Sequence, residues 1–246
     1  MWQKSTREEA NVVMIPRERH NEPAVIDAKT AELGNWRHLE AVGLVDDKGQ
    51  KVISTRWVIT EKEVDGVTKI KARLVIRGFE EEEEVQADAP TAAKTTLRIA
   101  LAMTANNNWP IETIDIKAAF LQGRPIERDV YITPPSEAEI SGKIWRLRKT
   151  AYGLIDAARN WFLSVKETLT ELGCKQSHLD KAVFRWYHKN MLEGIILLHV
   201  DDFFVSGNER FIEAVVQIVC IKFQVGKKKQ GNFKYVGLNI SKTSEV

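Results

Sequence analysis

Two adjacent carboxylates lie between two apolar runs in the sequence Gly194-Ile195-Ile196-Leu197-Leu198-His199-Val200-Asp201-Asp202-Phe203-Phe204-Val205. Residues 194–200 and 203–205 are predicted to form two buried strands, and Ser206-Gly207 ends the second. The acidic pair then falls at the turn of a tight hairpin. Burying unpaired charge costs free energy, and a hard cation such as Mg²⁺ would offset that cost by binding the carboxylate oxygens. The alternative is a solvent-exposed turn, because Asp is a common turn residue.

Length and composition set broad limits. The chain has 246 residues, a formal net charge of +2 at pH 7 and a hydrophobic content of 43%. These values suit one large domain or two small ones with a real core. Because the net charge is near zero, any nucleic-acid binding must come from local basic patches.

Cysteine usage and hydropathy add two expectations. Cys174 and Cys220 are far apart and show no metal-ligand spacing, which fits an intracellular compartment. No apolar run approaches the ~20 residues of a membrane span, and the first five residues lack the apolar core of a secretory signal. No membrane association is therefore expected.

A basic strand is predicted at residues 69–77, returning from a hairpin turn at Val64-Asp65-Gly66-Val67. A period of two places Ile70, Ala72, Leu74 and Ile76 on one face and Lys69, Lys71, Arg73 and Arg77 on the other. A solvated face is the usual explanation for such a run of charge, and a phosphate-holding face is the alternative.

The other expected elements follow from periodicity and turn residues. Helices are predicted at 24–39, 91–107, 156–172 and 209–223, and further strands at 42–45, 52–62, 111–116, 130–133, 143–147, 183–188 and 233–240. Residues 1–22 are expected to form a linker, the acidic run 80–84 a solvated loop, and Lys227-Lys228-Lys229 a short basic loop.

The second half of the chain has the order β-α-β-β-α-β, which is the split pattern of a ferredoxin-like sheet. We expect strands 111–116 and 195–200 to be neighbours in that sheet, so that Asp115 meets Asp201 and Asp202 at one edge. Three carboxylates at one edge suit two divalent cations. Two such ions can activate an attacking hydroxyl and stabilise the leaving oxygen of a phosphoryl displacement.

Several short motifs stand in a familiar order. They are Lys71-Ala72-Arg73-Leu74-Val75 with Gly78-Phe79, Asp115-Ile116-Lys117-Ala118-Ala119-Phe120-Leu121-Gln122-Gly123, Tyr152-Gly153-Leu154, and Val200-Asp201-Asp202. Together they resemble the reverse transcriptase domain of copia-type LTR retrotransposon Pol polyproteins, over about residues 23–240. The resemblance implies an α+β fold of reverse-transcriptase fingers and palm, the palm being a ferredoxin-like (βαββαβ) antiparallel sheet with helices on one face. It implies a reverse transcriptase domain at 23–246, with 23–109 mainly fingers and 110–246 mainly palm.

The same resemblance implies a metal site. Asp115, Asp201 and Asp202 resemble the catalytic aspartates that bind two Mg²⁺ or Mn²⁺ ions, and the carbonyl of Ile116 would help to hold a metal. Lys71 and Arg73 resemble the cations that hold the triphosphate.

Further implied roles concern the nucleotide, the primer and the template. Phe120 resembles the aromatic gate that excludes a ribose 2′-OH, and Gly153 resembles the glycine that lets the backbone approach the nucleotide. Tyr152, and Tyr235 with Gly237 in the primer-grip strand, are the implied primer and template contacts.

The implied activity is RNA-directed DNA polymerisation, in which deoxynucleotides (dNTPs) are added to a DNA primer on an RNA template. Integrase and RNase H are the implied partner domains, and a cytoplasmic virus-like particle is the implied location if the element is active. The family normally continues into a thumb and RNase H, and we expect both to be absent from this sequence.

Two departures from the family pattern leave alternatives open. His199 stands where a tyrosine is usual, and Ile155-Asp156-Ala157-Ala158 replaces Lys-Gln-Ala-Pro, which adds a negative charge where nucleic acid should pass. One alternative is an inactive remnant that at most binds nucleic acid. Another is a two-metal phosphatase or nuclease, which would need the same carboxylates but neither Phe120 nor the basic strand.

Overall fold

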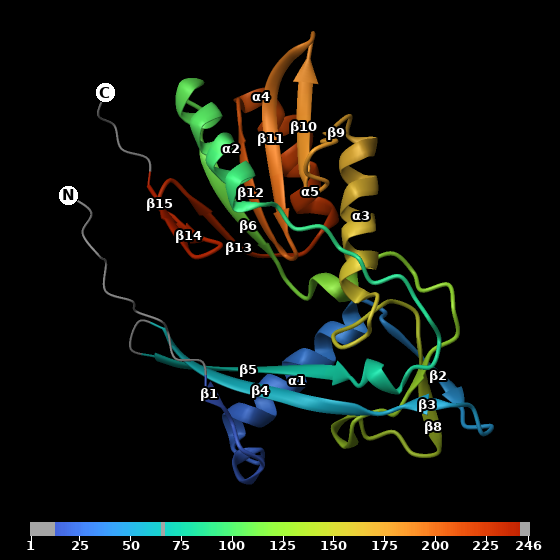
Figure 1. The fold of residues 1–246 in the computed structure, drawn as a ribbon. Helices are drawn as coiled ribbons and strands as arrows, with labels where there is room; N and C mark the ends of the chain where they lie inside the picture. Colours follow the sequence, from blue (N-terminus) through green and yellow to red (C-terminus); the bar gives the residue numbers. More distant parts are fainter. Residues whose placement is uncertain (1–12, 65–66, 242–246) are drawn as a thin grey trace. The chain divides into compact units, whose positions relative to one another are not determined.

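The computed structural model describes residues 13–64 and 67–241, which fall into two compact units (Figure 1). Unit 1 holds the described residues up to Glu83 together with Ile126–Leu154, and unit 2 holds Glu84–Pro125 and the described residues from Ile155 onward. These bounds differ from the expected division at residue 109, since the helix 94–106 belongs to unit 2 and the strands 131–132 and 143–147 belong to unit 1. The expected division into mainly fingers and mainly palm stays a prediction. Residues 1–12 of the expected linker, and Asp65-Gly66 of the expected turn, lie outside the described residues.

Unit 1 contains two small sheets and one long helix. Its elements are β1 (Val13–Met14), η1 (Arg17–Arg19), α1 (Pro23–His38), β2 (Val42–Asp46), β3 (Val52–Ile53), β4 (Thr55–Val64), β5 (Val67–Ile76), η2 (Gly78–Glu80), β7 (Tyr131–Ile132), η4 (Ser136–Ala138) and β8 (Lys143–Leu147). The strand orders are β1-β4-β5 and β2-β8-β7-β3.

The alternation predicted for the basic strand is confirmed in β5. Ala72, Leu74 and Ile76 are buried, and a small apolar cluster joins Ala72 to Val25 of α1. The expectation of a linker is wrong for residues 13–22, because β1 pairs with β4 and Ile15 is buried. Ile15 is apolar and buried, and its N–H donates to the carbonyl of Ile59, so it holds this segment against β4.

The acidic run is also more structured than a solvated loop. Glu80 accepts hydrogen bonds from the backbone N–H and the hydroxyl of Ser54, both at 2.8 Å, and these bonds lower the pKa of its carboxyl. Glu81 forms an ion pair with Arg128, at 2.7 Å from carboxylate oxygen to Nε. The sequence pattern missed these partners because they lie far away along the chain.

The backbones of residues 76–78 and 152–153, which are distant in sequence, pack closely against each other inside unit 1. A Cβ at Gly78 would lie 2.3 Å from the carbonyl oxygen of Gly153, and a Cβ at Gly153 would lie 1.9 Å from the carbonyl oxygen of Ile76. Gly153 has a φ of +95°, and the N–H of Ile76 donates to the carbonyl of Tyr152 at 2.8 Å. Glycine is therefore required at position 153 by the chain's own backbone, apart from any ligand.

Unit 2 is built on a six-stranded sheet. Its elements are α2 (Lys94–Asn106), β6 (Ile111–Ile116), η3 (Ala119–Gln122), α3 (Ala157–Glu171), β9 (Lys175–Gln176), β10 (Val183–His188), β11 (Met191–His199), β12 (Asp202–Gly207), α4 (Glu209–Phe211), the π-helical turn η5 (Ile212–Val216), α5 (Gln217–Lys222), β13 (Val225–Gln230), β14 (Phe233–Tyr235) and β15 (Leu238–Ile240). Within the described residues no helix is long and apolar enough to cross a membrane.

The strand order of the large sheet is β13-β6-β12-β11-β10-β9, which corrects the expected arrangement in two respects. First, β6 is the neighbour of β12 and not of β11. Second, the predicted basic loop 227–229 forms the edge strand β13, while the predicted strand 233–240 folds back as the separate hairpin β14–β15. An edge strand tolerates lysines because its outer side meets solvent. The hairpin turns at Val236 and Gly237, whose φ angles of 46° and 79° are the left-handed values that a two-residue turn favours.

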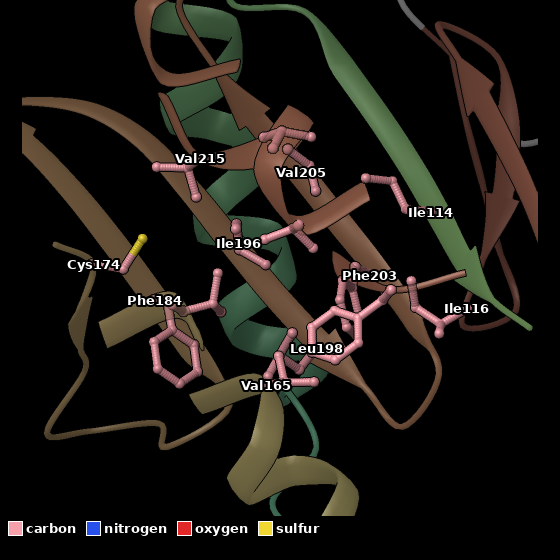
Figure 2. Close-up of a cluster of buried hydrophobic side chains, with 14 of the residues drawn as sticks. Ile114, Ile116, Val165, Cys174, Phe184, Ile196, Leu198, Phe203, Val205 and Val215 are labelled. Atoms are coloured by element: carbon pink, nitrogen blue, oxygen red, sulfur yellow. The ribbon is translucent and has the colours of Figure 1, made fainter. Parts of the chain in front are cut away.

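Both faces of this sheet are covered (Figure 1). The two helical segments of the expected β-α-β-β-α-β run pack on one face, and α2, which precedes that run, packs on the other. One face packs on α3 and on the 211–219 helical segment through Ile114, Ile116, Phe203, Val205 and their neighbours, several of which Figure 2 shows. The other face packs on α2 and on the hairpin β14–β15. The unbroken apolar run 195–198 explains this, since alternate side chains along β11 enter the two different cores.

We expect Gly153→Ala to lower the free energy of unfolding by about 3 kcal/mol or more, because it adds a backbone clash to a left-handed conformation. Gly142→Ala is the matched control, since Gly142 has a φ of +68° and nothing within 4 Å of an added Cβ. The control should lose only the ~1–2 kcal/mol of conformational strain. Equal losses in urea denaturation of the two variants would show that the close approach to Ile76 does not matter.

Candidate active site

The carboxylates meet through strand pairing. In the antiparallel register of β12 and β6, Asp202 lies directly opposite Asp115, and Asp201 belongs to the two-residue turn that joins β11 to β12. Directly opposite residues project to the same face, with Cβ atoms ~5 Å apart. The prediction that Asp115 meets the acidic pair is confirmed at the level of backbone placement, across a different strand pair from the one expected.

The turn that carries Asp201 is held from two sides. The N–H of Ile116 donates to the carbonyl of Asp201, and the indole Nε1 of Trp161 donates to the carbonyl of Val200, both at 2.8 Å. Val200 has a φ of 57°, which is rare for a β-branched residue and signals local strain. Trp161 is buried under the turn and stacks on Phe203, so α3 fixes a turn conformation that the local sequence disfavours.

Negative charge is concentrated at this turn. Burial, together with the charges of Asp115 and Asp201, raises the pKa of Asp202 to about 7, and the charge of Lys229 opposes that rise. Because the surroundings of Asp202 disfavour its negative charge, a cation bound beside it would be stabilised.

Two further residues shape the site and were missed by sequence reasoning. A Cβ at Gly226 would lie 2.6 Å from the Oδ2 atom of Asp115, so the absence of a side chain there makes room for the carboxylate. Gln122 donates to the carbonyl of Lys117 at 2.6 Å and accepts from the N–H of Gln224 at 2.7 Å, which ties the exit of β6 to the entry of β13. The sequence showed Gly226 only as a neighbour of the supposed basic loop, so it held no signal for this role.

The side chain of Tyr235, a predicted primer contact, is buried, so its ring and hydroxyl do not face a primer. Its side chain is 1% exposed, and its hydroxyl lies 3.3 Å from the carbonyl oxygen of Leu197 and 3.4 Å from that of Asp202. Burial raises the pKa of this hydroxyl above its usual range. Tyr235 therefore anchors the hairpin β14–β15 to the strands that carry the acidic pair, while the exposed Gly237 at the hairpin turn stays a predicted contact.

Four other predicted site residues belong to unit 1. Lys71 is exposed on β5, and Arg73 stacks on the ring of Tyr152, with its guanidinium carbon 5.4 Å from the ring centroid. Tyr152 and Gly153 follow β8 and pack against β5 as described above. Their roles toward the nucleotide and the template remain predictions, as does the role of Phe120, which is half-buried in η3 directly after β6.

The structure explains one of the two departures from the family pattern. Asp156 is 5% exposed and accepts a hydrogen bond from Asn160 at 2.8 Å, so the expectation that it presents negative charge to nucleic acid is wrong. His199 lies opposite Asp202 across the β11–β12 hairpin, and its buried Nδ1 has no hydrogen-bond partner among the described residues, so nothing in the structure explains this departure.

The donor set suits a hard metal ion, since three carboxylates and nearby backbone carbonyls offer only oxygen ligands. Within residues 13–64 and 67–241, no three acidic, histidine or cysteine side chains are grouped closely enough to hold a metal as they stand. The strand register and the raised pKa of Asp202 favour a cation at this edge of the sheet.

Comparison with known proteins decides the family. The sequence profile described as reverse transcriptase (RNA-dependent DNA polymerase) matches residues 40–246. This chain belongs to the reverse transcriptase family. Members of that family are RNA-directed DNA polymerases, and the assignment covers most of both units.

Curated relatives of this chain are transposon polyproteins. It is 31% identical over 174 residues to the Retrovirus-related Pol polyprotein from transposon TNT 1-94 of Nicotiana tabacum, which covers 66% of the chain and 13% of the relative. It is 30% identical to the RE1 polyprotein of Arabidopsis thaliana (64% and 11% covered) and to the Ty1-DR4 Gag-Pol polyprotein of Saccharomyces cerevisiae (67% and 10%). The resemblance to a copia-type reverse transcriptase domain is confirmed, and the chain spans only about an eighth or less of these relatives.

Among solved structures, the foamy viral protease-reverse transcriptase in complex with dsDNA is similar in fold. The match covers 97% of this chain and 43% of that one, with a TM-score of 0.50 and 16% sequence identity. The mixed α+β class is thereby confirmed.

We expect Gly226→Ala to reduce deoxynucleotide incorporation by about tenfold or more, because the new methyl group displaces the Asp115 carboxylate and small misplacements at a reacting centre are costly. The clashing atom is the end of a side chain, so the free energy of unfolding should change by less than about 1 kcal/mol. Gly34→Ala, with nothing within 4 Å of the added Cβ, is the control and should leave incorporation unchanged. Full incorporation by Gly226→Ala would contradict the role given to this glycine.

Proposed function

We propose that this chain performs nucleotidyl transfer from a dNTP to the 3′-OH of a DNA primer on an RNA template. Asp115, Asp201 and Asp202 would hold two divalent ions, Mg²⁺ or Mn²⁺, with the carbonyl of Ile116 as a further ligand. The observation that carries the proposal is the register that sets Asp202 opposite Asp115 beside the Asp201 turn. When bound, such ions lower the pKa of the primer hydroxyl and stabilise the leaving pyrophosphate.

The other site residues bind and orient the substrates in this proposal. Lys71 and Arg73 would hold the triphosphate by charge, and Arg73 is already oriented by its stacking on Tyr152. Phe120 would exclude a ribose 2′-OH by occupying the space below the sugar. Gly153 and Tyr152 would line the nucleotide and template side, and Gly237 would contact the primer.

We assign unit 2 to the palm and unit 1 to the fingers. In unit 2 the elements β6, α3, β11, β12, the 209–222 helical segment and β13 occur in the order βαββαβ, with the added strands β9 and β10 between α3 and β11. The four strands of this run lie in the order β13-β6-β12-β11, and β10 and β9 extend the sheet beyond β11. This order supports a ferredoxin-like palm. Integrase and RNase H domains of a longer polyprotein, within a cytoplasmic particle, are the proposed partners and location.

We expect the chain to extend oligo(dT) on poly(rA) with Mg²⁺ or Mn²⁺, and extension to vanish in Asp201→Asn. Phe120→Ala should begin to incorporate ribonucleotides, because the ring that excludes the 2′-OH is removed. Incorporation of dNTPs and rNTPs by the three proteins, measured side by side, tests both roles.

Three results would count against this function. Primer extension that persists in Asp201→Asn would show that Asp201 has no catalytic role. Salt-sensitive binding without extension would favour a non-catalytic remnant. Cleavage of nucleic acid at an equal rate by the wild type and Phe120→Ala would favour a nuclease.

A further inference from the structure

The edge strand β13 carries a lysine triplet that the proposed mechanism does not use. Among the described strands β13 pairs with β6 alone, at the end of the sheet order, and Lys227, Lys228 and Lys229 are all exposed. Three successive cations on an edge strand repel one another unless anionic groups lie near them, so the partners of each lysine decide what it can bind.

The register separates the three lysines into two groups. Lys227 lies opposite Asp115 and Lys229 lies opposite Thr113, whereas Lys228 lies opposite Ile114. Because opposite residues project to the same face, Lys227 and Lys229 share the face of Asp115 and Asp202. The charge of Lys229 also acts on the Asp202 carboxyl, which agrees with this placement.

Lys228, on the other face, has a structural partner. Its Nζ lies 2.7 Å from the Oε2 atom of Glu112, a side chain that is only 5% exposed. Gln230 donates to the other oxygen of the same carboxylate. Lys227 and Lys229 are exposed, and the charge of Lys229 acts on the Asp202 carboxyl, so both lysines are accessible to a ligand that lies beside the carboxylates.

We propose that Lys227 and Lys229 bind the phosphate backbone of the primer–template beside the carboxylates. Two residues apart on one face of a strand, they are ~7 Å apart, which lets both contact one nucleic-acid strand. Lysine binds phosphate as a flexible point charge and contributes affinity without sequence preference. The inference rests on the proposed polymerase function and adds a binding surface to it.

The competing explanation is protection of the sheet edge. Lysines on edge strands hinder pairing with a second chain, and this role would need no nucleic acid. Charge removal separates the two, because phosphate binding depends on salt and edge protection changes self-association.

The test is fluorescence anisotropy of a labelled RNA–DNA primer–template with the full chain, in EDTA, over a range of salt concentrations. Binding without metal is measured apart from catalysis. Lys227→Gln and Lys229→Gln should each lower the slope of log affinity against log salt by about 1, with equal losses on different template sequences.

Two control variants accompany these. Lys189→Gln removes an exposed charge at the opposite end of β11 and should leave the slope unchanged. Lys228→Gln should also leave the slope unchanged but lower the stability, because Glu112 loses its charge partner.

The outcomes separate the two proposals. An unchanged slope in the Lys227→Gln/Lys229→Gln double variant, or a wild-type chain that does not bind, overturns the lysine role even if primers are extended. Self-association of the double variant with an unchanged slope assigns the lysines to edge protection. In a last outcome, the wild type binds with a salt slope that falls when the lysines are replaced, yet never extends primers. That result overturns the polymerase proposal and upholds the binding surface.

Discussion

The pairing of β6 with β12 is the interaction on which the site depends. It sets Asp202 opposite Asp115, and the bond from the N–H of Ile116 to the carbonyl of Asp201 extends the same ladder into the turn. A shift of one residue would turn every side chain to the other face of the sheet. The register is protected against such a shift because both faces of β12 are buried, with Phe203 in one core and Phe204 in the other.

The surrounding structure stabilises an arrangement that the carboxylates themselves oppose. Trp161 bonds the strained Val200 from below, and the hydroxyl of Tyr235 reaches carbonyls of β11 and β12 from the opposite face. Gly226 leaves room for the Asp115 carboxylate. These contacts fix the backbone on which the three aspartates stand, whereas binding of a cation would require their side chains to close around it.

Much of this could be predicted from the sequence where the signal is local. The apolar run before Asp201, the hairpin turn, the stripe of α3 and the alternation of β5 are short-range patterns, and the structure contains all of them. The errors concern long-range pairing. Composition cannot show that Lys227–Lys229 pair with β6, that α2 covers the second face, or that Tyr235 and Asp156 are buried. The close packing of Gly78 against Gly153 likewise joins backbone atoms that are far apart in sequence.

The most direct measurement of the central claim is the free energy of unfolding of the wild type and Asp202→Asn between pH 4 and pH 8, with and without Mg²⁺. The pKa of Asp202 rises from 3.8 to about 7 on folding, so the folded state binds more protons than the unfolded state between these values. Without metal, the wild type should lose stability relative to the variant as the pH rises from about 4 to about 7, by about 2 kcal/mol after screening by solvent.

Mg²⁺ should restore that loss in the wild type at pH 8 and leave the variant unchanged. A stability difference that does not depend on pH, or an equal response of both proteins to Mg²⁺, would contradict a carboxylate site assembled for divalent ions.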